Sequence, residues 1–107
     1  MMSIAEACID PDHPALAGHF PGNPIVPGVL ILSKVLEALD RHYGTLSGPS
    51  SWPAVKFIGP LHPGERFAVA VENHSPDEIA FSVIVNRKTI ALGTMRRHRP
   101  FRTDVQS

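Results

Sequence analysis

Residues 18–39, GHFPGNPIVPGVLILSKVLEAL, decide the fold, because a stiff loop runs directly into the most convincing helix of the sequence. The three prolines of the loop each fix their own φ and push the preceding residue out of the helical region. The apolar residues that follow occupy every side of the first helical turn, and a helix of this kind is normally buried. The pattern predicts a buried helix over about Val29 to Tyr43, ended by Gly44.

The rest of the chain predicts strands that wrap this helix. Before the loop, residues 4–9 form a weakly alternating run that reads as an edge strand. After residue 50 the apolar period becomes two, so that Val55 and Phe57 share one face of a strand and Lys56 takes the other. Short turns join the later runs and indicate an antiparallel meander with one buried face. The alternating runs are residues 53–58, 66–73, 79–86 and 89–95.

Composition limits the class of protein. The 107 residues allow one domain, 1–107, with a basic tail from about residue 98 that we expect to be frayed. The formal net charge of zero argues against a nucleic-acid binder, and no histidine pair has the spacing of a zinc site, so no metal is expected. Cys8 has no partner for an internal disulfide, and no apolar run reaches the length of a membrane span. We therefore expect a soluble, cytoplasmic protein.

A resemblance now adds to this prediction. The segment HFPGNPIVPGVL at residues 19–30 resembles the signature of the hotdog-fold 3-hydroxyacyl-acyl carrier protein dehydratases, including the dehydratase-like proteins of aryl polyene type pathways. The segment VKFIGPLHPGE at 55–65 is similar to a strand, a Pro-Gly turn and the start of the next strand in that family. The resemblance covers roughly residues 14–97. It implies an α+β fold, a single hotdog domain in which a curved antiparallel sheet wraps around one long central helix.

The resemblance also implies a site. His19 would remove the α-proton of a 3-hydroxyacyl thioester, and an imidazole titrates near the working pH of such a base. The N–H of Gly28, at the positive end of the helix, would bind the thioester carbonyl as an oxyanion hole does. The remaining residues expected to contact substrate are Phe20, Gly22, Pro27 and Val29. No cofactor is expected, since the substrate would arrive on the phosphopantetheine of a carrier protein or on coenzyme A.

The sequence departs from the family at the general acid. The helix position 14 residues after His19, where the family has Asp or Glu, is Ser33. A hydroxyl cannot deliver a proton at neutral pH as a carboxylic acid does, and a lost general acid costs roughly 10²- to 10⁴-fold in rate. Glu37 lies one turn further on a similar face and is a candidate substitute. Its alternative role is a surface ion pair with Arg41.

Partners follow from the same resemblance. Hotdog dehydratases place the site at a dimer interface, so we expect a homo-oligomer, a dimer or higher, or a heterodimer with a related hotdog subunit that supplies the missing acid. Acyl carrier protein is the expected substrate carrier, and because it is acidic, a basic surface would speed its docking. The candidate docking residues are Arg96, Arg97 and Arg99. The alternative for these arginines is a solvated strand end and tail.

Three functions stay open at this point. The first is a hydro-lyase, a dehydratase or dehydratase subunit in fatty acid or polyketide and polyene-like biosynthesis. The second is an acyl thioesterase on the same fold. The third is a degenerate, non-catalytic hotdog subunit that pairs with an acid-bearing homologue.

Overall fold

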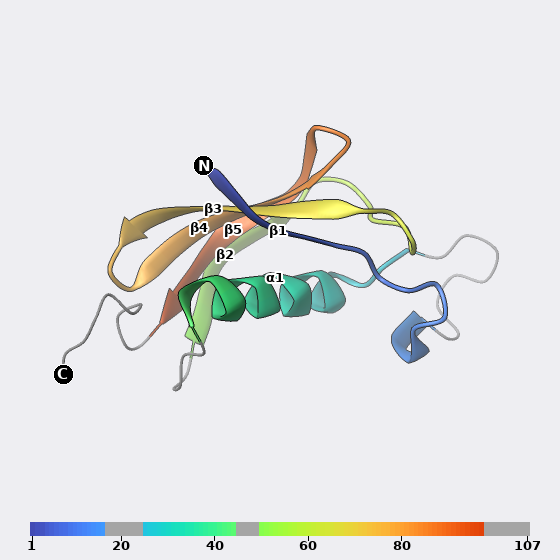
Figure 1. The fold of residues 1–107 in the computed structure, drawn as a ribbon, viewed down its shortest axis with the longest axis horizontal. Helices are drawn as coiled ribbons and strands as arrows, with labels where there is room; N and C mark the ends of the chain where they lie inside the picture. The colour runs from blue at the N-terminus through green and yellow to red at the C-terminus, as the bar shows by residue number, and fades with distance from the viewer. Residues whose placement is uncertain (17–24, 45–49, 98–107) are drawn as a thin grey trace.

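The computed structural model describes residues 1–16, 25–44 and 50–97, and Figure 1 shows one helix lying along one side of a sheet. The elements are, in chain order, β1 (Met2–Ala7), a short 3-10 helix (Pro14–Leu16), α1 (Gly28–Tyr43), β2 (Ser50–Phe57), β3 (Phe67–Ser75), β4 (Glu78–Val85) and β5 (Lys88–Arg97).

The five strands form one antiparallel sheet in the order β1-β3-β4-β5-β2. The predicted meander is confirmed as β3, β4 and β5, whose neighbours along the chain also pair in space. The predicted edge position of the first strand is confirmed too, although this strand runs from Met2 to Ala7 and not over residues 4–9. β2 forms the other edge, so the helix connects two strands that lie at opposite ends of the sheet.

The core lies between α1 and the sheet face toward it. The helix buries Ile31, Val35, Ala38 and Leu39. The strands alternate as predicted, and their core-facing side chains include Phe67, Val69, Val71, Ile79, Phe81, Val83 and Val85. The expectation that the helix is buried on every side is wrong for this chain by itself, because Val29 is 73% exposed. A single sheet covers only one side of a helix, so the other side stays open.

Two contacts hold the C-terminal turn of α1 to the sheet. The guanidinium of Arg97 on β5 lies 2.7 Å from the Asp40 carboxylate, and the Tyr43 hydroxyl donates a 2.6 Å hydrogen bond to Asn73 Oδ1 on β3. The helix then ends as predicted at Gly44, whose φ of 89° is a conformation that glycine adopts without steric cost.

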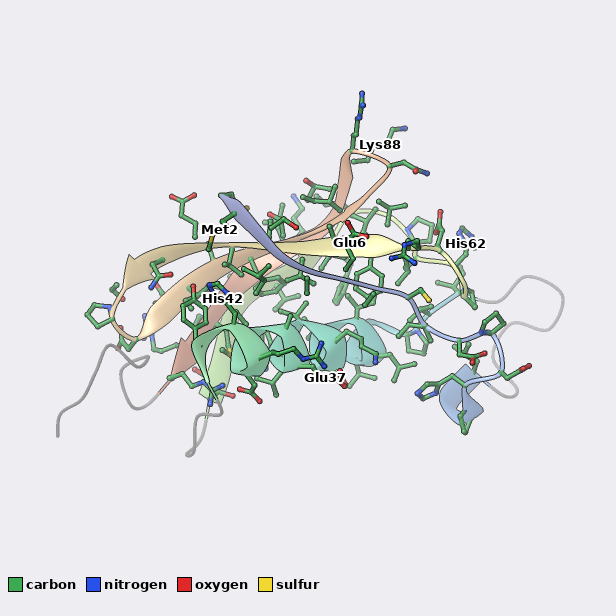
Figure 2. All side chains as sticks on the ribbon, viewed as in Figure 1. Met2, Glu6, Glu37, His42, His62 and Lys88 are labelled. Carbon is green, nitrogen blue, oxygen red and sulfur yellow. The ribbon has the colours of Figure 1, made fainter. Side chains whose placement is uncertain are left out.

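The β4–β5 hairpin has a two-residue turn. Asn86 and Arg87 both have positive φ, 49° and 68°, as the type I′ turns that match the right-handed twist of hairpin strands require. The turn consists of these two residues, and Lys88 begins β5. Figure 2 shows Lys88 at the tip of this hairpin, which extends away from the helix.

Candidate active site

The structure describes part of the predicted site. Pro27, Gly28 and Val29 form the start of α1, and Ser33 and Glu37 follow along the helix. His19, Phe20 and Gly22 lie outside the described residues, so their roles stay predictions.

The start of α1 offers backbone hydrogen-bond donors. Pro27 is the N-cap, with φ −60° and ψ 143°, and no side chain caps the helix. Its carbonyl accepts hydrogen bonds from the N–H groups of Leu30 at 3.0 Å and Ile31 at 3.4 Å. The N–H groups of Gly28 and Val29 come earlier, and no residue in the described ranges accepts a hydrogen bond from them. They lie at the positive end of the helix dipole and can bind a carbonyl or an anion there.

Backbone contacts hold this helix start in place. The N–H of Val26, two residues before Gly28, donates a 2.8 Å hydrogen bond to the carbonyl of Leu61. Val26 and Leu61 are both buried, at 3% and 0% exposure. The segment between β2 and β3 therefore positions the donors of α1, a role that sequence reasoning did not assign to it.

Phe57, the last residue of β2, was also missed as a site residue. Its ring contacts the backbone of Gly28 so closely that a Cβ at position 28 would lie 2.7 Å from Phe57 Cζ. This contact places Phe57 on the side of the sheet that faces the helix, yet the residue remains 46% exposed. A glycine at the first position of a helix was the available signal, since glycine is unfavourable in helices unless something needs the space.

Beyond its start, α1 presents an exposed stripe. Val29, Ser33 and Glu37 are spaced by four residues and all are exposed. Glu37 forms an ion pair with Lys34 at 3.5 Å, and not with Arg41, the partner in its alternative role. Figure 2 shows Glu37 on the side of the helix turned away from the sheet. Ser33 and Glu37 thus face away from the chain's own core, toward any subunit that covers this side.

The structure describes two of the three arginines that were expected to dock a carrier protein, Arg96 and Arg97. Arg97 is wrong as a docking residue, because it is only 4% exposed and its guanidinium is engaged by Asp40. Burial of a guanidinium requires a paired carboxylate, and Asp40 on the helix supplies one. Arg96 is accessible, with a side chain 52% exposed, but it pairs with Glu78 at 2.9 Å. Arg99 lies outside the described residues.

Within residues 1–16, 25–44 and 50–97, no three His, Cys, Asp or Glu side chains are grouped so that they could hold a metal ion. Over those same ranges, no helix has the length and apolar character needed to cross a bilayer. Burial raises the pKa of Tyr43 above its usual 10.0, but this hydroxyl lies at the opposite end of α1 from Gly28.

The chain is similar to known dehydratases. It is 31% identical over 77 residues to the 3-hydroxyacyl-[acyl-carrier-protein] dehydratase FabZ of Chloroflexus aggregans, an alignment that covers 65% of this chain and 54% of that protein. It is 44% identical over 59 residues to FabZ of Klebsiella pneumoniae subsp. pneumoniae, covering 55% of this chain and 32% of that protein. The chain therefore spans about half the length of the first of these relatives and about a third of the second.

A solved structure agrees with both the fold and the family. The dehydratase heterocomplex ApeI:P from Xenorhabdus doucetiae matches with a TM-score of 0.73 and 25% sequence identity, over 85% of this chain and 81% of that one. The predicted α+β hotdog fold is thereby confirmed. The family model of the ApeI-like proteins, described as ApeI dehydratase, matches residues 2–94, which include the helix, every strand but the end of β5, and the histidine loop. The chain belongs to the ApeI-like dehydratase family.

Proposed function

We propose that this chain is a subunit of a dehydratase that removes water from 3-hydroxyacyl thioesters carried by acyl carrier protein. Family membership supports the proposal, as do relatives that are named 3-hydroxyacyl-[acyl-carrier-protein] dehydratases. The observation that carries it is the start of α1, where the N–H groups of Gly28 and Val29 have no acceptor within the described residues. A thioester carbonyl would supply that acceptor.

The proposed reaction is an elimination through an enolate. The imidazole of His19 takes the α-proton, and the electrons of the broken C–H bond move onto the thioester oxygen. The N–H of Gly28 stabilises this developing charge. When the carbonyl reforms, the Cα–Cβ double bond forms, the bond from Cβ to the hydroxyl breaks, and the hydroxyl takes a proton and leaves as water. No electrons are gained or lost overall, so the proposal includes no cofactor besides the pantetheine arm of the carrier.

We assign the proton for the leaving hydroxyl to a second, related hotdog subunit. Ser33 occupies the helix position where the resemblance expects a carboxylic acid, and it is exposed. Glu37 is a weaker donor candidate, because it lies about 6 Å further along the helix axis and pairs with Lys34. A partner with Asp or Glu at the equivalent helix position would complete the site that His19 begins. The heterocomplex ApeI:P, itself named a dehydratase, is a precedent for such pairing.

The other functions receive less support. Relatives named as dehydratases do not favour the thioesterase or the non-catalytic subunit. In the proposed dehydratase, carrier-protein docking would involve Arg96, whose side chain is half exposed, and no longer Arg97. Fatty acid synthesis and polyene-like synthesis both use this reaction and remain alternative pathways.

The test is an assay of the purified chain, alone and together with the hotdog protein that co-purifies with it from its native host. The probe is 3-hydroxybutyryl-acyl carrier protein, and mass spectrometry follows the loss of water. We expect little turnover by the chain alone, and turnover at least about 100-fold faster in the mixed assembly, as a restored general acid would produce. His19→Ala in this chain should abolish the gain.

Two results would contradict the proposal in different ways. Full activity of the chain as a homo-oligomer would show that no partner acid is needed. Absence of turnover in every assembly, with and without a co-purifying protein, would exclude the dehydratase function for this probe and leave a binding role.

A further inference from the structure

We infer that Phe57 is a positioning residue for the thioester, acting as a wall that holds the substrate carbonyl at the N–H of Gly28 and keeps water from that hydrogen bond. This inference rests on the proposed function of the helix start. It concerns a residue on β2, outside the histidine loop and the helix that carry the rest of the site.

The first observation is the contact between Phe57 and Gly28. A Cβ built at position 28 would lie 2.7, 3.0 and 3.2 Å from the Cζ, Cε2 and Cε1 atoms of the ring. The tip of the ring therefore fills the place where any other residue would carry its side chain. A carbonyl that accepts a hydrogen bond from this N–H must lie close to the edge or face of the ring.

The second observation is that the ring extends from a well-anchored strand end. The two residues after Phe57 donate hydrogen bonds to the carbonyl of Ile90, from Ile58 N–H at 2.7 Å and Gly59 N–H at 3.1 Å. On the strand itself, Phe57 is paired with Ala91, which is fully buried. An aromatic ring on a fixed backbone can hold a bound group in one place, which is what orientation at a reacting centre requires.

The third observation is the partial exposure of this side chain. Packing on Gly28 leaves Phe57 46% exposed, although the residues beside it in the same row of the sheet are buried. The three nearest residues of this row are Ala91, Val83 and Val69. The ring thus has an uncovered surface next to the free donors of α1. An apolar surface there lowers the local dielectric constant, and a hydrogen bond to a developing oxyanion becomes stronger where water is excluded.

The hydrogen bond from Gly28 should therefore stabilise the transition state more than the bound substrate. The carbonyl oxygen is neutral in the bound substrate and negative in the enolate, so water exclusion at Gly28 matters most in the transition state. Phe57→Ala should therefore lower kcat about tenfold or more and change KM by less than about threefold. Phe57→Met restores a long apolar side chain and should therefore recover part of the lost kcat.

Leu92→Ala is the matched control for these variants. Leu92 is exposed to a similar degree, 39%, and lies on β5 beside the partner of Phe57, but it pairs with Lys56 and so belongs to the opposite face of the sheet. Its truncation should leave kcat and KM within about twofold of the parent values.

A second readout does not depend on turnover. Labelling the eight glycines with ¹⁵N gives a simple amide spectrum in which Gly28 can be assigned. Butyryl-pantetheine serves as the probe, because it has the thioester carbonyl but no hydroxyl to eliminate. It should shift the Gly28 amide proton in the parent assembly and in Leu92→Ala, and this shift should be lost in Phe57→Ala and partly restored in Phe57→Met.

The outcomes separate this inference from the proposed dehydratase. A Gly28 shift and a kcat that survive Phe57→Ala unchanged would overturn the inference and leave the dehydratase function intact. A shift that depends on Phe57 without turnover in any assembly would support the inference and overturn the dehydratase. If butyryl-pantetheine leaves the Gly28 amide unmoved in the parent, the carbonyl site is wrong and both fall.

Discussion

At the scale of single residues, the proposed function makes Ser33 the position where this chain lacks a general acid of its own. It is exposed on α1, and glutamate is a good helix former, so Ser33→Glu should leave the fold unchanged. We expect this variant to give the chain by itself a dehydration rate about 10²-fold higher or more, because a carboxylic acid replaces a hydroxyl. The assay is water loss from 3-hydroxybutyryl-acyl carrier protein.

Ser33→Gln is the control for this prediction, since it has the same length as the glutamate without an acidic proton. Activity gained equally by both variants would mean that size and not acidity matters at this position. Adding Glu37→Gln to the Ser33→Glu variant then asks whether the native carboxylate contributes a proton.

The raised pKa of Tyr43 predicts how the free energy of unfolding depends on pH. Burial raises the pKa of its hydroxyl above 10.0, so the unfolded chain loses this proton at lower pH than the folded chain does. The stabilisation is fully present below about pH 10 and is lost as the pH rises through the folded pKa. The free energy of unfolding can be measured by urea denaturation from about pH 8 to about pH 11, which brackets the ordinary pKa of tyrosine. Over this range it should fall more steeply for the parent than for Tyr43→Phe.

The same variant has a second effect that is independent of pH. Tyr43→Phe removes the hydrogen bond to Asn73 and should lower the free energy of unfolding by about 1 kcal/mol at pH 8. Parallel pH profiles for the two proteins would show that another group causes the alkaline loss.

At the scale of elements, the pairing of β2 with β5 depends on Gly93. A Cβ at this position would lie 2.2 Å from the carbonyl oxygen of Ala54, a backbone atom that cannot move aside without separating the strands. Gly93→Ala should cost about 2 kcal/mol or more in the free energy of unfolding, measured by urea denaturation. It should also reduce activity, because β2 carries Phe57.

Gly59→Ala is the matched control for Gly93→Ala. The nearest atom to a Cβ there is 3.7 Å away, an ordinary van der Waals distance, so the stability should change by less than about 1 kcal/mol. Equal losses in the two variants would mean that strand approach is not the reason for Gly93.

The β4–β5 hairpin contains an avoidable strain. Arg87 has a φ of 68°, a conformation that costs an L-residue other than Gly, Asn or Asp roughly 1 kcal/mol. Arg87→Gly should raise the free energy of unfolding by about 0.5 to 1 kcal/mol, since Asn-Gly is a favoured pair for this turn. Lys88→Gly, within β5, should lower it instead, and differential scanning calorimetry can compare the two.

At the scale of the whole molecule, the described residues leave one side of α1 exposed and have β1 and β2 as the two edges of the sheet. Val29 is 73% exposed at the start of the helix, and Phe57, whose ring contacts Gly28, and the adjacent Ile58 are 46% and 56% exposed. These apolar surfaces favour association with another subunit.

Val29→Asp tests whether this side of the helix is the interface. We expect the charge to weaken pairing at least about tenfold, because an aspartate in an apolar interface loses its hydration. The circular dichroism spectrum should not change. Light scattering after size-exclusion chromatography measures the assembly, with Leu92→Asp, on the opposite face of the sheet, as the control. Unchanged assembly in Val29→Asp would place the interface elsewhere.

Sequence reasoning predicted the local features of this molecule well. The helix begins at Gly28 and ends at Tyr43, within one residue of the prediction, because an apolar run, a proline before it and a glycine after it are all local signals. The alternation in β3, β4 and β5 could also be predicted from the sequence. Two-residue turns join β3 to β4 and β4 to β5, so each strand pairs with the next one in the chain. The family was also readable from the sequence, because its motif at residues 19–30 is a local signal.

Contacts between residues that are distant in the sequence could be seen only in the folded chain. Arg97 was read as part of a basic surface, but the fold brings Asp40 to it from 57 residues away and buries it. Phe57 was read as one member of an alternating face, but the position of β2 beside β5 brings its ring against Gly28. The physical reason is that periodicity specifies which side of an element is apolar, whereas non-local strand pairing specifies which element that side meets.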